Sequence, residues 1–102
     1  NKADIAASFQ AAVVDVLCEH TMEAALRCGH KIVTLAGGVA SNSALRQKMT
    51  EVGEKNGIKV LYPPPVLCTD NAAMIACAGY YSYIAGERAP LSLNAVPSLP
   101  LE

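Results

Sequence analysis

The chain has 102 residues, of which 52% are hydrophobic and 17% are charged, and its formal net charge is −1. A charge so close to neutral argues against a free-standing nucleic-acid-binding domain, which normally carries a basic surplus. Small domains leave much of their surface in water, so this apolar content predicts either burial against a partner or a piece of a larger protein.

The N-terminal part of the chain predicts one long helix over residues 4–28. Apolar residues recur there at steps of three and four, which is typical of a helix with one buried face. Asp4 is the candidate N-cap, and Gly29 is the candidate signal for the C-terminal end. The residues expected to face inward are Ile5, Phe9, Val13, Val16, Leu17, His20 and Ala24.

Two short apolar runs predict strands on either side of a second helix. Residues 32–36 are rich in β-branched side chains and do not alternate with polar ones, as expected of a strand covered on both faces. A helix is expected over 43–56, with Leu45 and Met49 facing inward, and a second strand over 58–62. A strand–helix–strand unit predicts a parallel pair joined by a right-handed crossover.

The last third of the chain begins with three prolines at 63–65, which predict an extended segment. A third helix is expected from about Asp70 to Gly86. It is apolar almost all round, so we expect it to be deeply buried. The tail over 90–100 contains three prolines and is expected to lie extended over the surface.

The predicted order, α-β-α-β-α, gives an α/β fold whose sheet is a short parallel strand pair. Parallel sheets are normally covered on both sides, and the third helix needs more protein around it than this chain offers. We therefore expect a piece of a larger protein, with residues 1–89 forming part of one lobe and residues 90–102 forming an extended tail.

The cysteines and the segments that the chain lacks predict its location. The four cysteines lie in apolar contexts, which predicts reduced, mostly buried thiols. They are Cys18, Cys28, Cys68 and Cys77. No apolar run reaches the length of about 18 residues that a membrane span needs, and no signal peptide is visible. We therefore expect a cytoplasmic protein without a membrane partner.

Two Cys-x-His pairs, Cys18 with His20 and Cys28 with His30, invite comparison with a zinc site. A spacing of two residues points the two side chains of a helical pair to different faces. The spacing also differs from that of structural zinc ligands. A zinc cluster is therefore not expected.

Gly37 and Gly38 follow the first predicted strand and lead into the second helix. In parallel α/β sheets, ligands bind beyond the carboxyl ends of the strands. Glycine admits a close approach to the backbone there, and the N–H groups of a helix N-terminus favour phosphate. The alternative is a tight turn with Ser41 or Asn42 as the N-cap and no ligand.

Asp70 follows the second predicted strand by a few residues, so it should lie at the same sheet edge as the two glycines. Its carboxylate could simply cap the third helix, or it could bind a metal ion or a substrate hydroxyl. One carboxylate alone is an incomplete metal site. A nucleophilic triad is not supported, because Ser41 and Ser43 have no placeable base and the GxSxG motif is absent.

The stretches AGGVASNSALR and LYPPPVLCTDNAAMIACAGYY together resemble the C-terminal region of the TsaD family, in its bacterial type. Its members were formerly named O-sialoglycoprotein endopeptidases or glycoproteases. The resemblance extends over nearly the whole chain, including the tail. It implies an actin-like (ASKHA) fold, in which this chain would supply the later helices and last two strands of the second lobe.

The resemblance also implies an activity. Family members transfer a threonylcarbamoyl group from threonylcarbamoyl-AMP to N6 of the tRNA adenosine next to the anticodon. Gly37 and Gly38 match glycines that approach the nucleotide phosphate, and Asn42 matches an asparagine that binds the adenylate ligand. Asp70 matches an aspartate that ligates a divalent metal ion, iron or another. No residue here matches a catalytic nucleophile.

In the family, two histidines of an HxEGH-type motif in the first lobe complete the metal site. This sequence has no such motif, so we expect the isolated chain to be inactive. The resemblance implies tRNA and TsaB- and TsaE-like proteins as partners, and exposed strand edges would permit a homodimer.

Two alternatives stay open. The chain could be half of another ASKHA kinase that transfers phosphoryl groups from ATP, with Asp70 as base or Mg²⁺ partner. It could also be a non-enzymatic, self-associating module that uses its apolar surface to dimerise.

Overall fold

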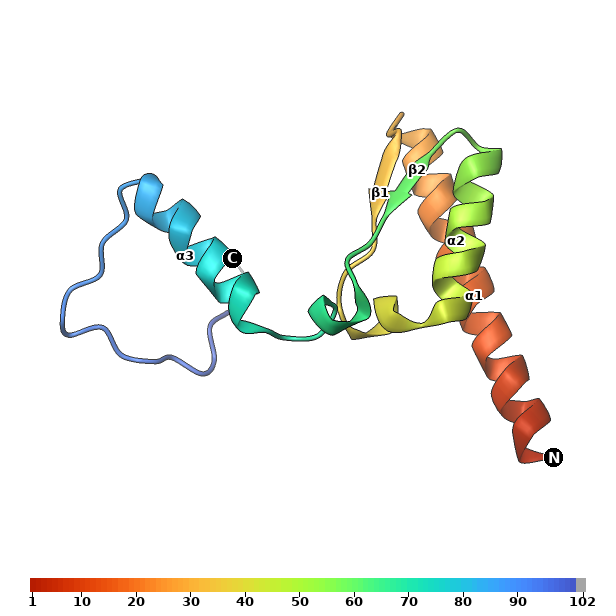
Figure 1. Cartoon of the computed structure of the whole chain (residues 1–102), viewed down its shortest axis with the longest axis horizontal. Helices are drawn as coiled ribbons and strands as arrows, with labels where there is room; N and C mark the ends of the chain where they lie inside the picture. Colours follow the sequence, from red (N-terminus) through yellow and green to blue (C-terminus); the bar gives the residue numbers. More distant parts are fainter. Residues whose placement is uncertain (101–102) are drawn as a thin grey trace. The chain divides into compact units, whose positions relative to one another are not determined.

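The computed structural model describes residues 1–100, whose element order α-β-α-β-α confirms the predicted α/β class (Figure 1). The elements are α1 (Lys2–Arg27), β1 (Ile32–Thr34), the 3-10 helix η1 (Gly38–Ser41), α2 (Ser43–Lys55), β2 (Lys59–Leu61), the 3-10 helix η2 (Pro65–Leu67) and α3 (Ala72–Ile84). The chain divides into two compact units after Asp70. The predicted division into part of a lobe over 1–89 and an extended tail over 90–102 stays a prediction.

In the first unit, β1 and β2 form the predicted parallel pair, with Val33 opposite Val60. Because side chains alternate along a strand, these two valines lie on one face, where they pack against the core formed with α1 and α2. Ile32, next to Val33, is 57% exposed. The prediction of a strand covered on both faces is therefore wrong for residues 1–100, in which only one face is covered.

The core of the first unit lies between the two helices and the strand pair. Met49 is only 1% exposed, and the predicted inward positions Leu45 and Met49 are both confirmed. The buried cluster consists of Val14, Cys18, Met22, Ala25, Leu45, Met49 and Ile58. At the rim of this packing, Lys48 of α2 pairs with Asp15 of α1, and the hydrogen bond to Asp15 raises the pKa of the Lys48 ammonium group.

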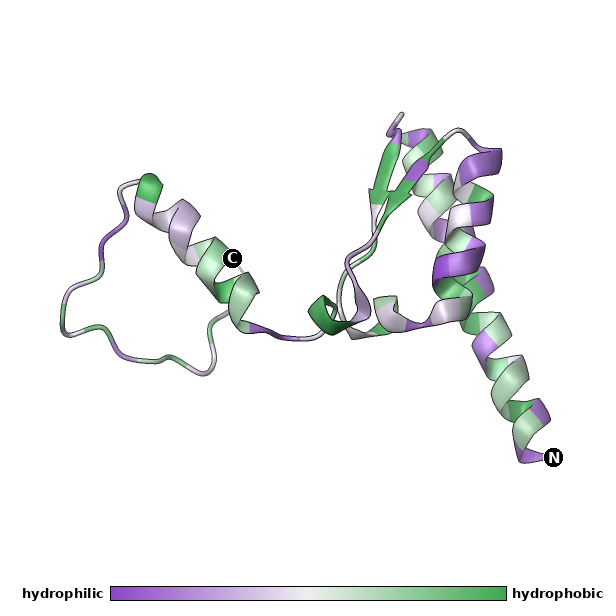
Figure 2. Cartoon of the chain, in the orientation of Figure 1, coloured by the Kyte–Doolittle hydropathy of each residue, from purple (hydrophilic) through white to green (hydrophobic). Residues whose placement is uncertain are grey.

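The buried face of α1 differs from the predicted one. Phe9 is 72% exposed and Ile5 is 70% exposed, while the buried residues of α1 are Val14, Cys18, Met22 and Ala25. The helix therefore carries apolar residues outside its buried face, and Figure 2 shows hydrophobic residues in green along its first turns. Periodicity alone therefore could not select the face that packs.

The ends of α1 confirm one predicted signal and correct the other. The N-cap is Asn1, whose side-chain oxygen accepts a hydrogen bond from the Asp4 N–H at 2.9 Å, so Asp4 is not the cap. Gly29 follows the helix with φ of +72°, a conformation that favours glycine. The predicted C-terminal signal is therefore confirmed.

Helix α2 approaches the start of β2 closely at Gly53. A Cβ atom at Gly53 would lie 2.8 Å from the Ile58 carbonyl oxygen and 2.7 Å from Cγ2 of Val60.

Gly53→Ala should therefore lower the free energy of unfolding by about 1–3 kcal/mol, although alanine is the better helix former by about 1 kcal/mol. Urea unfolding measures this change. The control is Gly79→Ala in α3, where no atom lies within 4 Å of the added carbon. A Gly53→Ala protein as stable as the original would contradict the close approach.

The segment before α3 is extended only in part, although an extended segment was predicted. Pro64 is extended, with φ of −52° and ψ of 149°, but Pro65 already begins η2.

The N-cap of α3 is Asn71, whose side-chain oxygen accepts from the Met74 N–H at 3.1 Å. No residue of Ala72–Ile84 is buried within the described chain, so the deep burial expected of α3 is not found within residues 1–100 and stays a prediction for a larger protein. Its unit holds no other helix or strand within residues 71–100 to form a core with it.

The four cysteines are free, and only half of them are buried. Cys18 and Cys68 are buried, whereas Cys28 and Cys77 are exposed, so the expectation of mostly buried thiols is correct for two. Burial raises the pKa of the Cys18 thiol. Within residues 1–100, no helix combines the length and the apolar content needed to cross a membrane.

Candidate functional site

The loop after β1 holds the two predicted glycines. Gly37 has φ of +85° and ψ of 173°, a backbone conformation that is essentially restricted to glycine. Its carbonyl oxygen accepts from the Ala40 N–H at 3.0 Å, and this bond starts η1. A Cβ atom at either Gly37 or Gly38 would meet no atom within 4 Å. The backbone is therefore open to a ligand at both positions.

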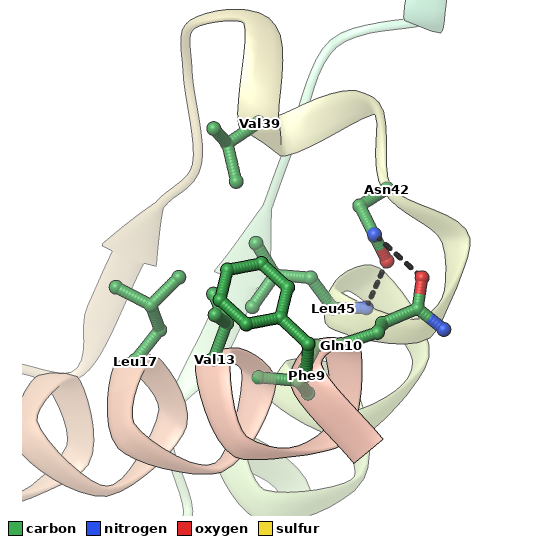
Figure 3. Close-up of a pocket in the computed structure, with 8 residues that line it drawn as sticks. Phe9, Gln10, Val13, Leu17, Val39, Asn42 and Leu45 are labelled. Atoms are coloured by element: carbon green, nitrogen blue, oxygen red, sulfur yellow. Dashed lines mark hydrogen bonds between the residues drawn. The ribbon is translucent and has the colours of Figure 1, made fainter. Parts of the chain in front are cut away.

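Asn42 connects this loop to α2. Its side-chain oxygen accepts from the Leu45 N–H at 3.0 Å, so Asn42 is the N-cap of α2. Its amide nitrogen donates to Oε1 of Gln10 at 3.0 Å, as the dashed lines in Figure 3 show. An amide nitrogen carries two hydrogens, so the Gln10 bond uses one of them and orients the other. The capping role and a ligand role are therefore compatible.

An apolar pocket of about 220 Å³ opens beside Asn42 (Figure 3). Its wall is apolar apart from the amides of Gln10 and Asn42. The lining residues are Phe9, Gln10, Val13, Val14, Leu17, Val39, Asn42 and Leu45. Apolar walls with a few polar groups are typical of small-molecule sites, but such sites usually enclose about 300 Å³ or more. The pocket is therefore apolar with two polar side chains, like such sites, but smaller than most of them.

The loop after β2 carries Asp70. Because β1 and β2 are parallel, their carboxyl ends lie at the same edge of the sheet, and both loops leave from that edge (Figure 1). The Leu35 N–H donates to the Leu61 oxygen at 2.8 Å, so the two chains stay paired just past β1. Asp70 is exposed, and its neighbour Asn71 caps α3. The capping alternative for Asp70 is therefore not realised.

Arg46 of α2, which was not among the residues predicted from the sequence, joins the two loops. Its Nε donates to the Ala40 oxygen in η1, and its Nη2 donates to the Pro63 oxygen at 2.9 Å and to Sγ of Cys68 at 3.0 Å. The guanidinium also lies 4.6 Å from the centre of the Tyr62 ring. One signal could have revealed it. A helix dipole disfavours a cation near its N-terminus, so an arginine one turn into α2 needs partners outside the helix.

The residues of this edge fit a divalent metal ion only in part. Asp70 supplies one exposed carboxylate, a ligand type that hard cations prefer. Within residues 1–100, no three His, Cys, Asp or Glu side chains lie close enough together to hold a metal ion.

Comparison with known proteins gives consistent matches. A family model described as TsaD, tRNA N6-adenosine threonylcarbamoyltransferase, matches residues 1–77. Among curated proteins with that name, the one from Clostridioides difficile (strain 630) is 59% identical over 98 residues, covering 96% of this chain and 29% of the relative. That from Moorella thermoacetica is 56% identical over 101 residues, covering 99% of this chain and 30% of the relative. That from Symbiobacterium thermophilum is 61% identical over 100 residues, covering 98% and 29%. The chain thus spans less than a third of the length of these relatives.

Proposed function

This chain belongs to the TsaD family of tRNA N6-adenosine threonylcarbamoyltransferases, and on that premise we propose that it supplies one wall of a transferase site. In the complete enzyme, by which we mean the longer protein proposed to contain this segment, a threonylcarbamoyl group passes from threonylcarbamoyl-AMP to N6 of the tRNA adenosine next to the anticodon. The α/β order is consistent with part of an actin-like (ASKHA) lobe.

The observation that carries this proposal is the meeting of two loops at one sheet edge. The loop with Gly37 and Gly38 and the loop that ends in Asp70 follow parallel strands, and Arg46 bonds to both. Ligands of parallel α/β sheets bind at such an edge. An anhydride that carries both a phosphate and a carbamoyl group needs contacts to both ends, and the two loops offer different chemistry.

We assign these residues as follows. The backbone N–H groups at Gly37 and Gly38 hold the adenylate phosphate and stabilise it as it departs. The Asn42 amide, oriented by Gln10, hydrogen-bonds the nucleotide. Asp70 is one ligand of a divalent cation, which when bound polarises the substrate and neutralises charge. The N6 amine attacks the carbamoyl carbon, the bond from that carbon to the phosphate oxygen breaks, AMP leaves with the electron pair, and the proton that N6 releases passes to water.

The proposal extends to the surroundings of the site. We infer that the partners of the complete enzyme are tRNA and TsaB- and TsaE-like proteins, and that it works in the cytoplasm. Because the present sequence has no HxEGH motif, residues 1–102 alone are expected to transfer nothing.

The test of the proposed function is direct. The complete enzyme is incubated with threonylcarbamoyl-AMP and unmodified tRNA, and the nucleosides are analysed by mass spectrometry. Formation of threonylcarbamoyladenosine supports the proposal. Absence of that product together with phosphorylation of a small acceptor by ATP would contradict it and favour a kinase.

Gly38→Ala separates ligand binding from folding. Gly38 does not have a positive φ, and an added Cβ would meet no protein atom within 4 Å, so stability should stay unchanged. The methyl group would occupy the space proposed for the phosphate, so the affinity for AMP should fall about tenfold, a loss of 1.4 kcal/mol. Isothermal titration of the complete enzyme with AMP measures this loss.

The contrasting variant is Gly37→Ala, which places alanine at φ of +85°. It should lower both AMP affinity and stability, the latter by about 1–3 kcal/mol. Unchanged AMP affinity in Gly38→Ala would contradict the proposal that this loop binds the phosphate.

A further inference from the structure

We propose that Arg46 is a positioning residue that fixes the separation between the Gly37-Gly38 loop and Asp70, and thereby couples adenylate binding to cation binding. The inference rests on the proposed function, because it takes the two loops as parts of one site. It assigns Arg46 no contact with the substrate. Its effect passes through the backbone of the loops it holds.

The contacts of Arg46 fall on both loops, at two buried residues and one half-buried residue. Nε bonds to the carbonyl oxygen of Ala40, a residue that is 2% exposed. Nη2 bonds to Sγ of Cys68, which is 1% exposed, and to the carbonyl oxygen of Pro63. Buried polar contacts are costly to leave unmade. The guanidinium therefore holds the two loops together by three partly buried hydrogen bonds.

The planar shape of the guanidinium sets the geometry of this link. An arginine side chain presents its donors as a rigid fork, whereas a lysine is a single point charge on a flexible stem. The Tyr62 ring, with its centre 4.6 Å from the guanidinium carbon, further fixes the plane of the fork. A lysine at position 46 would keep the charge but could not hold three acceptors at fixed directions.

The anchored points lie close to the proposed ligand groups. Ala40 is two residues after Gly38, and Cys68 is two residues before Asp70. Two residues of chain span at most about 7 Å. A shift at either anchor therefore moves the phosphate contacts or the carboxylate relative to one another. The affinity for a ligand that contacts both groups would change, since such a ligand must reach the phosphate contacts and the carboxylate at the same time.

Two simpler roles for Arg46 predict different results. If it only stabilised the fold, its replacement would lower stability and leave the coupling between ligands intact. If it bound the phosphate directly, its replacement would weaken AMP binding equally with and without a cation. A positioning role predicts a selective loss: AMP affinity without the cation changes little, while the gain in affinity that the cation provides disappears.

The experiment titrates the complete enzyme with AMP in the presence and absence of Mn²⁺. The variants are Arg46→Met, which keeps the apolar stem, and Arg46→Lys, which keeps the charge. Lys48→Met is the matched control, since it removes a cation from the same helix that bonds only to Asp15 of α1 among the contacts described. The measured quantity is the factor by which Mn²⁺ raises AMP affinity.

We expect this factor to fall about fivefold or more in both Arg46 variants and to stay unchanged in Lys48→Met. Amide hydrogen exchange should at the same time rise in residues 38–42 and 62–69. Retained coupling in a folded Arg46→Lys protein, or an equal loss of AMP affinity with and without Mn²⁺, would overturn the inference. A wild-type enzyme that binds no AMP would overturn the proposed function instead. Arg46→Lys keeps the test decisive even where Arg46→Met does not fold.

Discussion

Asp70→Asn should lower threonylcarbamoyl transfer by the complete enzyme about a hundredfold or more, since loss of a supporting contact around a metal site already costs about 10–100-fold. The substitution keeps the size of the side chain but removes the negative charge that a divalent cation prefers. The fold should be unaffected, because the Asp70 carboxylate is exposed and Asn71 caps α3. The loss should therefore appear in kcat/KM and in bound metal, and not in stability.

The control for this substitution is Asp15→Asn. Asp15 is a carboxylate on α1 that pairs with Lys48 at the surface, where such pairs contribute about 0.2–1 kcal/mol. Its replacement should leave transfer activity and metal content unchanged. Metal content is measured by plasma mass spectrometry, and activity by nucleoside analysis. An Asp70→Asn enzyme with the original metal content would exclude Asp70 as a ligand.

Met49→Ala should give the largest loss of stability, about 2–5 kcal/mol. Met49 is 1% exposed and belongs to the cluster in which α1, α2 and the start of β2 meet. Removing its thioether leaves a cavity that the surrounding helices can close only in part. Urea unfolding followed by circular dichroism gives the change in the free energy of unfolding.

Two further variants test whether the loss at Met49 comes from the cavity. Met49→Leu nearly conserves the volume and should cost less than about 1.5 kcal/mol. Ile84→Ala, at a position on α3 that is 57% exposed, should change stability by no more than about 0.5 kcal/mol. A Met49→Ala protein that unfolds at the same urea concentration as the original would contradict the core described for this chain.

The order of the elements was predictable because their ends carry strong local signals. Gly29 adopts the positive φ expected after α1, and Gly57, with φ of +65°, follows α2. These conformations depend on the local backbone and on the absence of a side chain, so they are visible in the sequence. The parallel pairing of β1 and β2 also followed, since the connection between them contains a helix.

The packing faces were harder to predict because they depend on partners. α1 carries apolar residues on more than one face, and the face with the small residues Cys18 and Ala25 is buried in the core while the larger Phe9 stays exposed. The apolar composition of α3 predicted burial, but no residue of Ala72–Ile84 is buried in the described chain. Composition reports what a helix can bury, and the structure determines which of those surfaces meet.

The candidate site was predictable in position but not in construction. Gly37, Gly38 and Asp70 were found from their places after the two strands. The link through Arg46 was not, since its acceptors are backbone oxygens of Ala40 and Pro63 and the sulfur of Cys68. Backbone acceptors have no residue type, so the sequence could signal only that an arginine near the start of α2 needs partners, and not which atoms those partners are.

The spacing of residues along α2 has a consequence for how this segment can change over evolution. Asn42, Arg46, Met49 and Gly53 follow one another at steps of four, three and four, which aligns them along one side of a helix. This stretch of α2, about 16 Å long, thus carries the N-cap, the arginine that bonds to both loops, a buried core methionine and the glycine that lies close to the start of β2. Substitutions at these four positions should therefore be tolerated mainly in combination. A change at one position that tilts α2 would also displace the residues at the other end of the helix.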